Sequence, residues 1–124
     1  MRRLVLYLVL FLNLVTPALA IDMPEGSEQF YVIQGMFEAL AIEPQSCTLE
    51  DAVINFACGQ FKGELSNFQS QLESYIGEFL PGLYLTVDWF DNNGASVRDY
   101  RSGKGRYLFA FYPGSMIVVA FTPR

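Results

Sequence analysis

The chain has 124 residues, of which 52% are hydrophobic and 15% are aromatic, and its formal net charge is −5 at pH 7. This aromatic content argues against disorder, and the length suits one domain with a modest core. The sequence contains no histidine, which excludes Ser-His-Asp and Cys-His catalysis and the usual zinc sites. We therefore expect a protein that is not an enzyme and has no cofactor. The net negative charge disfavours nucleic acid as a partner.

The first twenty residues have the three parts of a secretory signal peptide. Two arginines come first, an apolar run follows from Leu4 to Val15, and the segment ends in Ala18-Leu19-Ala20. The run is shorter than the roughly 20 residues that span a bilayer. We expect cleavage after Ala20, a secreted or periplasmic protein with no stable membrane anchor, and a single domain over 21–124. That domain has six basic and thirteen acidic side chains, a net charge of −7.

The first predicted element of the domain is a helix that begins after Ser27 and continues to Ala41. Ser27 is a good N-cap, and apolar residues recur at helical spacing on one face: Phe30, Ile33, Phe37 and Leu40. Pro44 ends the helix. A short strand over Phe30 to Ile33 is the alternative interpretation.

The two cysteines of the sequence, Cys47 and Cys58, are expected to form a disulfide. Export to an oxidising compartment favours the bridge, and closing a loop of this length stabilises the fold by about 3 kcal/mol in the chain-entropy model. Two separate buried thiols are the alternative. A redox-active pair is disfavoured because the spacing is not that of a Cys-x-x-Cys motif.

A long apolar stripe follows, and it suggests a helix over the same stretch. Thr48 is a second N-cap candidate. Apolar residues then recur at spacings of three and four: Ile54, Cys58, Phe61, Leu65, Phe68, Leu72, Ile76 and Phe79. The pattern is typical of an amphipathic helix.

An unbroken helix and the disulfide exclude each other. At 1.5 Å per residue, a continuous helix would separate Cys47 and Cys58 by about 16 Å, whereas a disulfide needs Cα atoms within about 7 Å. Gly59 is a position where a break costs little. We therefore predict a short helix that ends near Cys58, a turn, and a second helix from about Lys62 to Phe79.

After Pro81-Gly82, the apolar period changes from helical to alternating. Four strands linked by turn sequences are predicted at Leu83–Phe90, Ala95–Arg101, Arg106–Tyr112 and Met116–Thr122. In the first strand, Leu83, Leu85, Val87 and Trp89 form the expected core face. The sequence thus predicts an α+β fold in which two or three N-terminal helices pack on a four-stranded antiparallel meander.

The last two predicted strands are apolar on both faces. One face carries Tyr107, Phe109, Phe111, Ile117, Val119 and Phe121, and the other carries Leu108, Ala110, Tyr112, Met116, Val118 and Ala120. Separate helices covering the two sides would explain this pattern. Otherwise the second set is an exposed apolar surface, which marks a binding site. We predict a non-catalytic protein-interaction module that self-associates or docks on a protein partner through this second set.

A different class of function is also compatible with the apolar pattern. The aromatic strands and the helical residues Phe61, Leu65, Phe68 and Leu72 would line a cavity between helix and sheet. In that case the protein is a carrier of an apolar ligand.

The basic residues are concentrated in one hairpin. Four of the six basic side chains of the domain lie within nine residues: Arg98, Arg101, Lys104 and Arg106. Arginines beside a glycine-rich turn suit a phosphate, sulfate or carboxylate, so an anion-binding hairpin is a third hypothesis. The alternatives are a solvated hairpin and contact with the acidic helices of a neighbouring copy.

Overall fold

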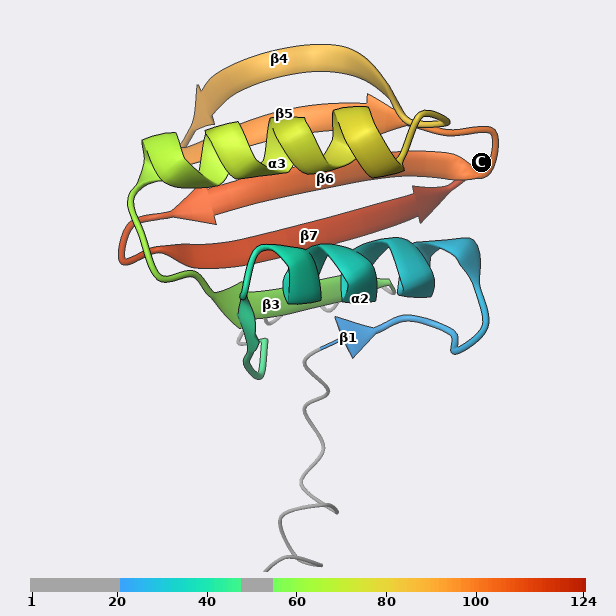
Figure 1. Cartoon of the computed structure of the whole chain (residues 1–124), viewed down its shortest axis with the longest axis horizontal. Helices are drawn as coiled ribbons and strands as arrows, with labels where there is room; N and C mark the ends of the chain where they lie inside the picture. The colour runs from blue at the N-terminus through green and yellow to red at the C-terminus, as the bar shows by residue number, and fades with distance from the viewer. Residues whose placement is uncertain (1–20, 48–54) are drawn as a thin grey trace, which may run out of the picture.

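The computed structural model describes residues 21–47 and 55–124 (Figure 1). The described elements are β1 (Ile21–Asp22), α2 (Glu28–Ala39), β2 (Glu43–Pro44), β3 (Phe56–Gln60), α3 (Leu65–Phe79), β4 (Tyr84–Asn92), β5 (Ala95–Arg101), β6 (Gly105–Tyr112) and β7 (Met116–Pro123). The mixed α+β class is confirmed. The predicted signal peptide over 1–20 and the predicted helix start at Thr48 lie outside the described residues.

All described strands belong to one antiparallel sheet, whose order is β1-β3-β7-β6-β5-β4, with β2 also paired to β3. Strands β4 to β7 form the predicted meander, but the sheet is larger than the four strands predicted. The meander leaves one side of β7 free, and β3 pairs with it in five residue pairs. This pairing satisfies backbone groups that would otherwise form an open edge.

The prediction of a short helix ending near Cys58 is wrong, because this residue lies in strand β3. Phe56 to Gly59 are buried, and a short buried apolar run does not distinguish strand from helix by its period. Gly59 is not a helix break. A Cβ atom at this position would lie 2.9 Å from the carbonyl oxygen of Glu43 and 3.0 Å from the ring of Phe37, so glycine permits the close approach of β2 and α2.

Helix α2 begins where the sequence predicts. The hydroxyl of Ser27 accepts a hydrogen bond from the backbone N–H of Phe30 at 3.3 Å, which satisfies one free donor of the first turn. The helix ends two residues earlier than predicted, and Ala41 has a left-handed φ of 54°. The alternative of a strand over Phe30 to Ile33 is therefore wrong.

Helix α3 begins at Leu65, three residues later than predicted, and packs on the same face of the sheet as α2 (Figure 1). At the start of this helix, the backbone N–H of Glu64 donates a hydrogen bond to Asn67 Oδ1 at 3.2 Å. Its buried residue Phe68 lies with its ring centroid 5.5 Å from that of Phe111 on β6. The main core is therefore between the helices and one face of the sheet, and its sheet side is formed by Tyr107, Phe109, Ile117, Val119 and Phe121.

Strand β4 is an irregular edge strand, which changes its expected core face. The pairing with β5 shifts between Leu85 and Val87 and again between Val87 and Phe90. Such bulges move later side chains to the other face. Trp89 packs against Phe68 as part of the core, but Val87 is 44% exposed. The prediction of an uninterrupted alternation in this strand is wrong for that reason.

Candidate functional site

The six residues of the predicted interaction surface lie on the face of the sheet opposite the helices, here called the open face. They form three direct cross-strand pairs between β6 and β7: Leu108 with Ala120, Ala110 with Val118, and Tyr112 with Met116. Tyr112 is 38% exposed, Ala110 is buried, and the other four are half-buried. The two described helices do not cover both faces, so the alternative with a helix on each side is wrong for the described residues.

The apolar character of the open face extends to the neighbouring strands. Val97 on β5 pairs with Ala110 and also with the exposed Phe90 on β4. Ala95, Val97 and Ala110 form a second buried cluster, with Leu108 and Val118 packed against it. The members of this cluster all come from strands β5, β6 and β7. The sheet therefore has a separate apolar cluster on the side away from α2 and α3.

The predicted disulfide is confirmed, and it borders one end of the open face. Cys47 and Cys58 are bridged, with their Cα atoms 5.3 Å apart, and the backbone N–H of Gln45 donates to the carbonyl of Cys58 at 2.9 Å. A hollow of about 280 Å³ lies beside the bridge, lined by Ser46, Cys47, Cys58, Tyr112, Pro113, Met116 and Val118. The bridge thus holds the segment before Cys47 against the apolar end of the open face.

Arg98 does not belong to the predicted anion site, because it faces helix α3. Its Nη1 lies 3.0 Å from Glu73 Oε1 and its Nε lies 3.3 Å from Asp88 Oδ1. Its guanidinium also lies over the rings of Trp89 and Tyr100, at 5.5 and 5.4 Å from the centroids. The side chain is only 10% exposed, so its positive charge is paired with Glu73 and Asp88 and is not available to an external anion.

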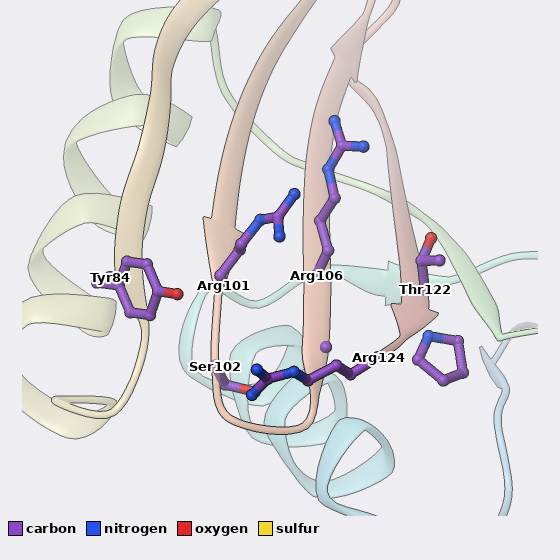
Figure 2. A pocket seen from close by; sticks show the side chains of 8 residues that line it. Tyr84, Arg101, Ser102, Arg106, Thr122 and Arg124 are labelled. Carbon is purple, nitrogen blue, oxygen red and sulfur yellow. The ribbon is translucent and has the colours of Figure 1, made fainter.

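The other basic residues are placed at the opposite end of the sheet from the disulfide. A hollow of about 350 Å³ there, here called the arginine hollow, is lined by Tyr84, Arg101, Ser102, Gly105, Arg106, Thr122, Pro123 and Arg124 (Figure 2). Lys104 is not among its lining residues, which corrects the predicted set. Arg124 is a lining residue that sequence reasoning missed, because no local spacing connects it to the hairpin. Its backbone N–H donates to the carbonyl of Lys104 at 3.0 Å.

Helix α2 is tied to the β5–β6 hairpin by a small polar network. The carboxylate of Glu28 accepts hydrogen bonds from the hydroxyls of Ser102, at 3.1 Å, and Tyr107, at 3.2 Å. Burial and then the nearby carboxylate of Glu28 raise the pKa of Tyr107 well above its usual value. Burial likewise raises the pKa of Tyr75 and Tyr100.

The raised pKa values of these three tyrosines indicate that the protein loses stability at alkaline pH. Their pKa values in the folded protein exceed the value of 10.0 in the unfolded chain, so the unfolded chain loses protons first as the pH rises. The free energy of unfolding should therefore be constant just below pH 10 and fall above it. Urea unfolding between about pH 8 and pH 11 measures this slope. In the Tyr107→Phe variant, the free energy of unfolding should fall less steeply with pH than in the wild type. An unchanged slope would contradict the raised pKa of Tyr107.

A third hollow lies between helix and sheet, but not where the carrier hypothesis placed it. Phe61, Phe68 and Leu72 are buried in the core, because their side chains pack directly on the sheet. The hollow has a volume of about 440 Å³ and lies between the last turns of α3 and strands β4 and β5. Its lining residues are Glu73, Ile76, Gly77, Leu80, Pro81, Leu83, Leu85, Arg98 and Tyr100.

Comparisons with known proteins find no protein-family model, no curated protein and no solved structure that matches the chain. Neither helix in the described part of the chain is long and apolar enough to cross a membrane. A search of the same residues finds no group of three or more Cys, Asp or Glu side chains arranged to hold a metal ion. The disulfide fits an extracellular protein.

Proposed function

We propose that the protein is an exported, non-catalytic interaction module that self-associates through the open face of its sheet. The observation that supports this proposal is the placement of both described helices on one face (Figure 1). The other face presents three apolar cross-strand pairs and carries exposed aromatic residues at Tyr112 and Phe90. An apolar sheet face that neither described helix covers is a candidate binding site.

The size of the open face suits a second copy of the chain. Strands β6 and β7 have eight residues each, which corresponds to about 26 Å at 3.3 Å per residue. The five longer strands, β3 to β7, lie about 4.8 Å apart and so give a face of roughly 600 Å² before the surface of projecting side chains is added. A stable interface buries about 800 Å² per partner. Two such faces can pack against each other at about 10 Å, as in a β-sandwich.

Charge selects the orientation of the two copies. Arg101 and Arg106 lie at one end of the open face, and Tyr112 and Met116 lie at the other. If the two-fold axis lies between the two faces and crosses the strands at a right angle, the arginine end of each copy lies over the apolar end of its partner. If the axis runs along the strands, the arginine ends of the two copies lie over each other and repel. The antiparallel arrangement is therefore the one we propose.

The first test replaces Tyr112 by alanine. Tyr112 lies at the apolar end of the open face, and an aromatic residue that an interface buries contributes about 2 kcal/mol or more, so Tyr112→Ala should weaken the dimer at least about 30-fold. Sedimentation equilibrium of the disulfide-bonded protein measures the dissociation constant. Tyr31→Ala is the matched control, because Tyr31 is a 63% exposed tyrosine on helix α2 and should leave the dimer unchanged.

Two results would contradict self-association. One is a wild-type protein that remains monomeric at about 100 µM, well above the dissociation constants of stable dimers. The other is a control variant, Tyr31→Ala, that dissociates the dimer as strongly as Tyr112→Ala does. Circular dichroism of both variants verifies that each is folded.

The hollow beside α3 supports a second candidate function, the transport of an apolar ligand. Ile76, Leu80, Leu83 and Leu85 provide its apolar wall, and the ion pair of Arg98 with Glu73 lies at its border. This combination suits an apolar ligand with one polar group. Native mass spectrometry of the protein purified without detergent distinguishes the two functions, because a carrier retains a small apolar molecule and a self-associating module shows the mass of two chains.

A further inference from the structure

The arginine hollow brings together cationic side chains from three separate segments. Arg101 ends strand β5, Arg106 lies near the start of β6, and Arg124 follows β7. In Figure 2, Arg101 and Arg106 extend along the open face, and Arg124 extends across the strand ends to Ser102. The sheet topology therefore creates a basic site that is not contiguous in the sequence.

Most of the donors in this hollow are unused. Within residues 21–47 and 55–124, the side chains of Arg101 and Arg124 form neither an ion pair nor a hydrogen bond. Arg106 uses its Nε in a 2.8 Å bond to Asp99 Oδ2, which leaves four of its five N–H donors available. Of the three guanidinium groups, only that of Arg106 is paired within the described residues, with Asp99, and the nearby carboxylate of Glu28 is bonded to Ser102.

Hydroxyl groups complete the donor set of the hollow. Tyr84 and Thr122 are lining residues from β4 and β7, and the hydroxyl of Tyr84 points toward Arg101 in Figure 2. Forked guanidinium donors and hydroxyls from several directions suit an anion with three or four acceptor oxygens. A carboxylate has two oxygens and is satisfied by a single arginine fork.

We propose that the arginine hollow binds a phosphate group, either as free phosphate or as a phosphate monoester. Arg101 and Arg124 are the primary ligands because neither has a partner in the described part of the chain. Arg106 is a third ligand, held in place by the 4% exposed side chain of Asp99. All of its lining residues come from one copy, so the site is complete in a monomer, and in the proposed antiparallel dimer the apolar end of the partner lies over it.

The probe for this site is inorganic phosphate, titrated at constant ionic strength against chloride. The Nε–H signals of Arg101, Arg106 and Arg124 in a two-dimensional NMR spectrum should shift and saturate together. Arg101→Gln and Arg124→Gln should each weaken phosphate binding about tenfold, the loss expected when one charge-assisted hydrogen-bond partner is removed. Titration of the monomeric Tyr112→Ala variant should give saturable binding at least as tight as that of the wild type, because every lining residue is present in one copy; this result separates the phosphate site from the dimer interface.

Lys104→Gln is the matched control, because it removes the same charge from the same hairpin without changing a lining residue. It should change the affinity by less than about twofold, since a separated surface charge is largely screened. An equal loss in Lys104→Gln and Arg101→Gln would overturn the proposal, because binding would then depend on general charge attraction. Arginine signals that do not saturate would also overturn it.

The same variants identify the source of the phosphate. Vesicles of phosphatidylcholine are compared with vesicles that also contain phosphatidic acid. Flotation that requires both phosphatidic acid and Arg101 supports a lipid phosphate as the ligand. Binding of inorganic phosphate without flotation supports a soluble phosphate compound. Failure to bind either form overturns the proposal.

Discussion

Replacing Phe68 by alanine is expected to lower the free energy of unfolding by about 3–5 kcal/mol. Phe68 is completely buried, and its ring lies against Phe61, Trp89 and Phe111, with centroids 5.6, 6.1 and 5.5 Å away. Truncation removes all three contacts and leaves a cavity that the surrounding aromatic rings cannot fill. Because small domains have a total stability of about 5–15 kcal/mol, this loss is a large fraction of the whole.

Helix α3 provides a matched control for this experiment. Phe79 has the same side chain in the same helix but is 61% exposed, so Phe79→Ala should change the free energy of unfolding by less than about 1 kcal/mol. Urea denaturation followed by fluorescence of the single tryptophan measures both variants. Similar values for the two variants would contradict the assignment of the core to the helix side of the sheet.

Removing the disulfide is expected to cause the second largest loss in the free energy of unfolding. The double variant Cys47→Ser with Cys58→Ser should lose about 2–4 kcal/mol, because the bridge closes a loop with a sequence separation of 11 residues and restricts the unfolded chain. Replacing both cysteines avoids an unpaired thiol. The loss should be visible as a lower urea midpoint for the variant than for the oxidised wild type.

Reduction of the wild-type protein provides an independent test of the same prediction. A reducing agent should lower the wild-type midpoint to that of the double variant and leave the variant unchanged. Wild-type protein whose stability does not respond to reductant would contradict a stabilising role of the bridge. The hollow beside the bridge is lined by Cys47 and Cys58 themselves, so the double variant should also weaken the proposed dimer.

Local sequence signals were sufficient for the C-terminal hairpins. Strand β5 has the predicted bounds Ala95–Arg101, and the turn before it contains Asn93 and Gly94, with φ angles of 53° and 88°. Asn-Gly favours this turn because both residues accept a positive φ. The N-cap of α2 at Ser27 was predictable for a similar reason, since the hydroxyl and the N–H that it binds are three residues apart.

Strand β3 was not predictable from its own residues. Within its residues, Phe56 to Gln60, Cys58 lies at helical spacing in the stripe that ends in α3. Over so short a run, the apolar period alone does not separate a helix from a strand. The strand forms because the free side of β7 is available about 60 residues later in the chain. Only the disulfide prediction, which required Cys47 and Cys58 to lie close together, indicated that a continuous helix was wrong.

The predicted anion site was partly resolvable from the sequence. Side chains of a strand alternate between faces, so the odd spacing of Arg98 and Arg101 already places them on opposite sides of the sheet. The structure bears this out, since Arg98 pairs with Glu73 of α3 while Arg101 lines the arginine hollow. Arg124 lies at this hollow only because β6 pairs with β7, which brings the end of β7 beside Arg106.

The sequence by itself determined that the last two strands are apolar on both faces, because alternation is a property of each strand and needs no other segment. It could not determine which face the helices cover. That depends on where α2 and α3 pack, and the buried residues of both helices belong to the same core cluster as Tyr107, Phe109 and Val119. Tertiary structure therefore decided which apolar set became core and which became surface, since burial of a side chain depends on segments distant in the chain.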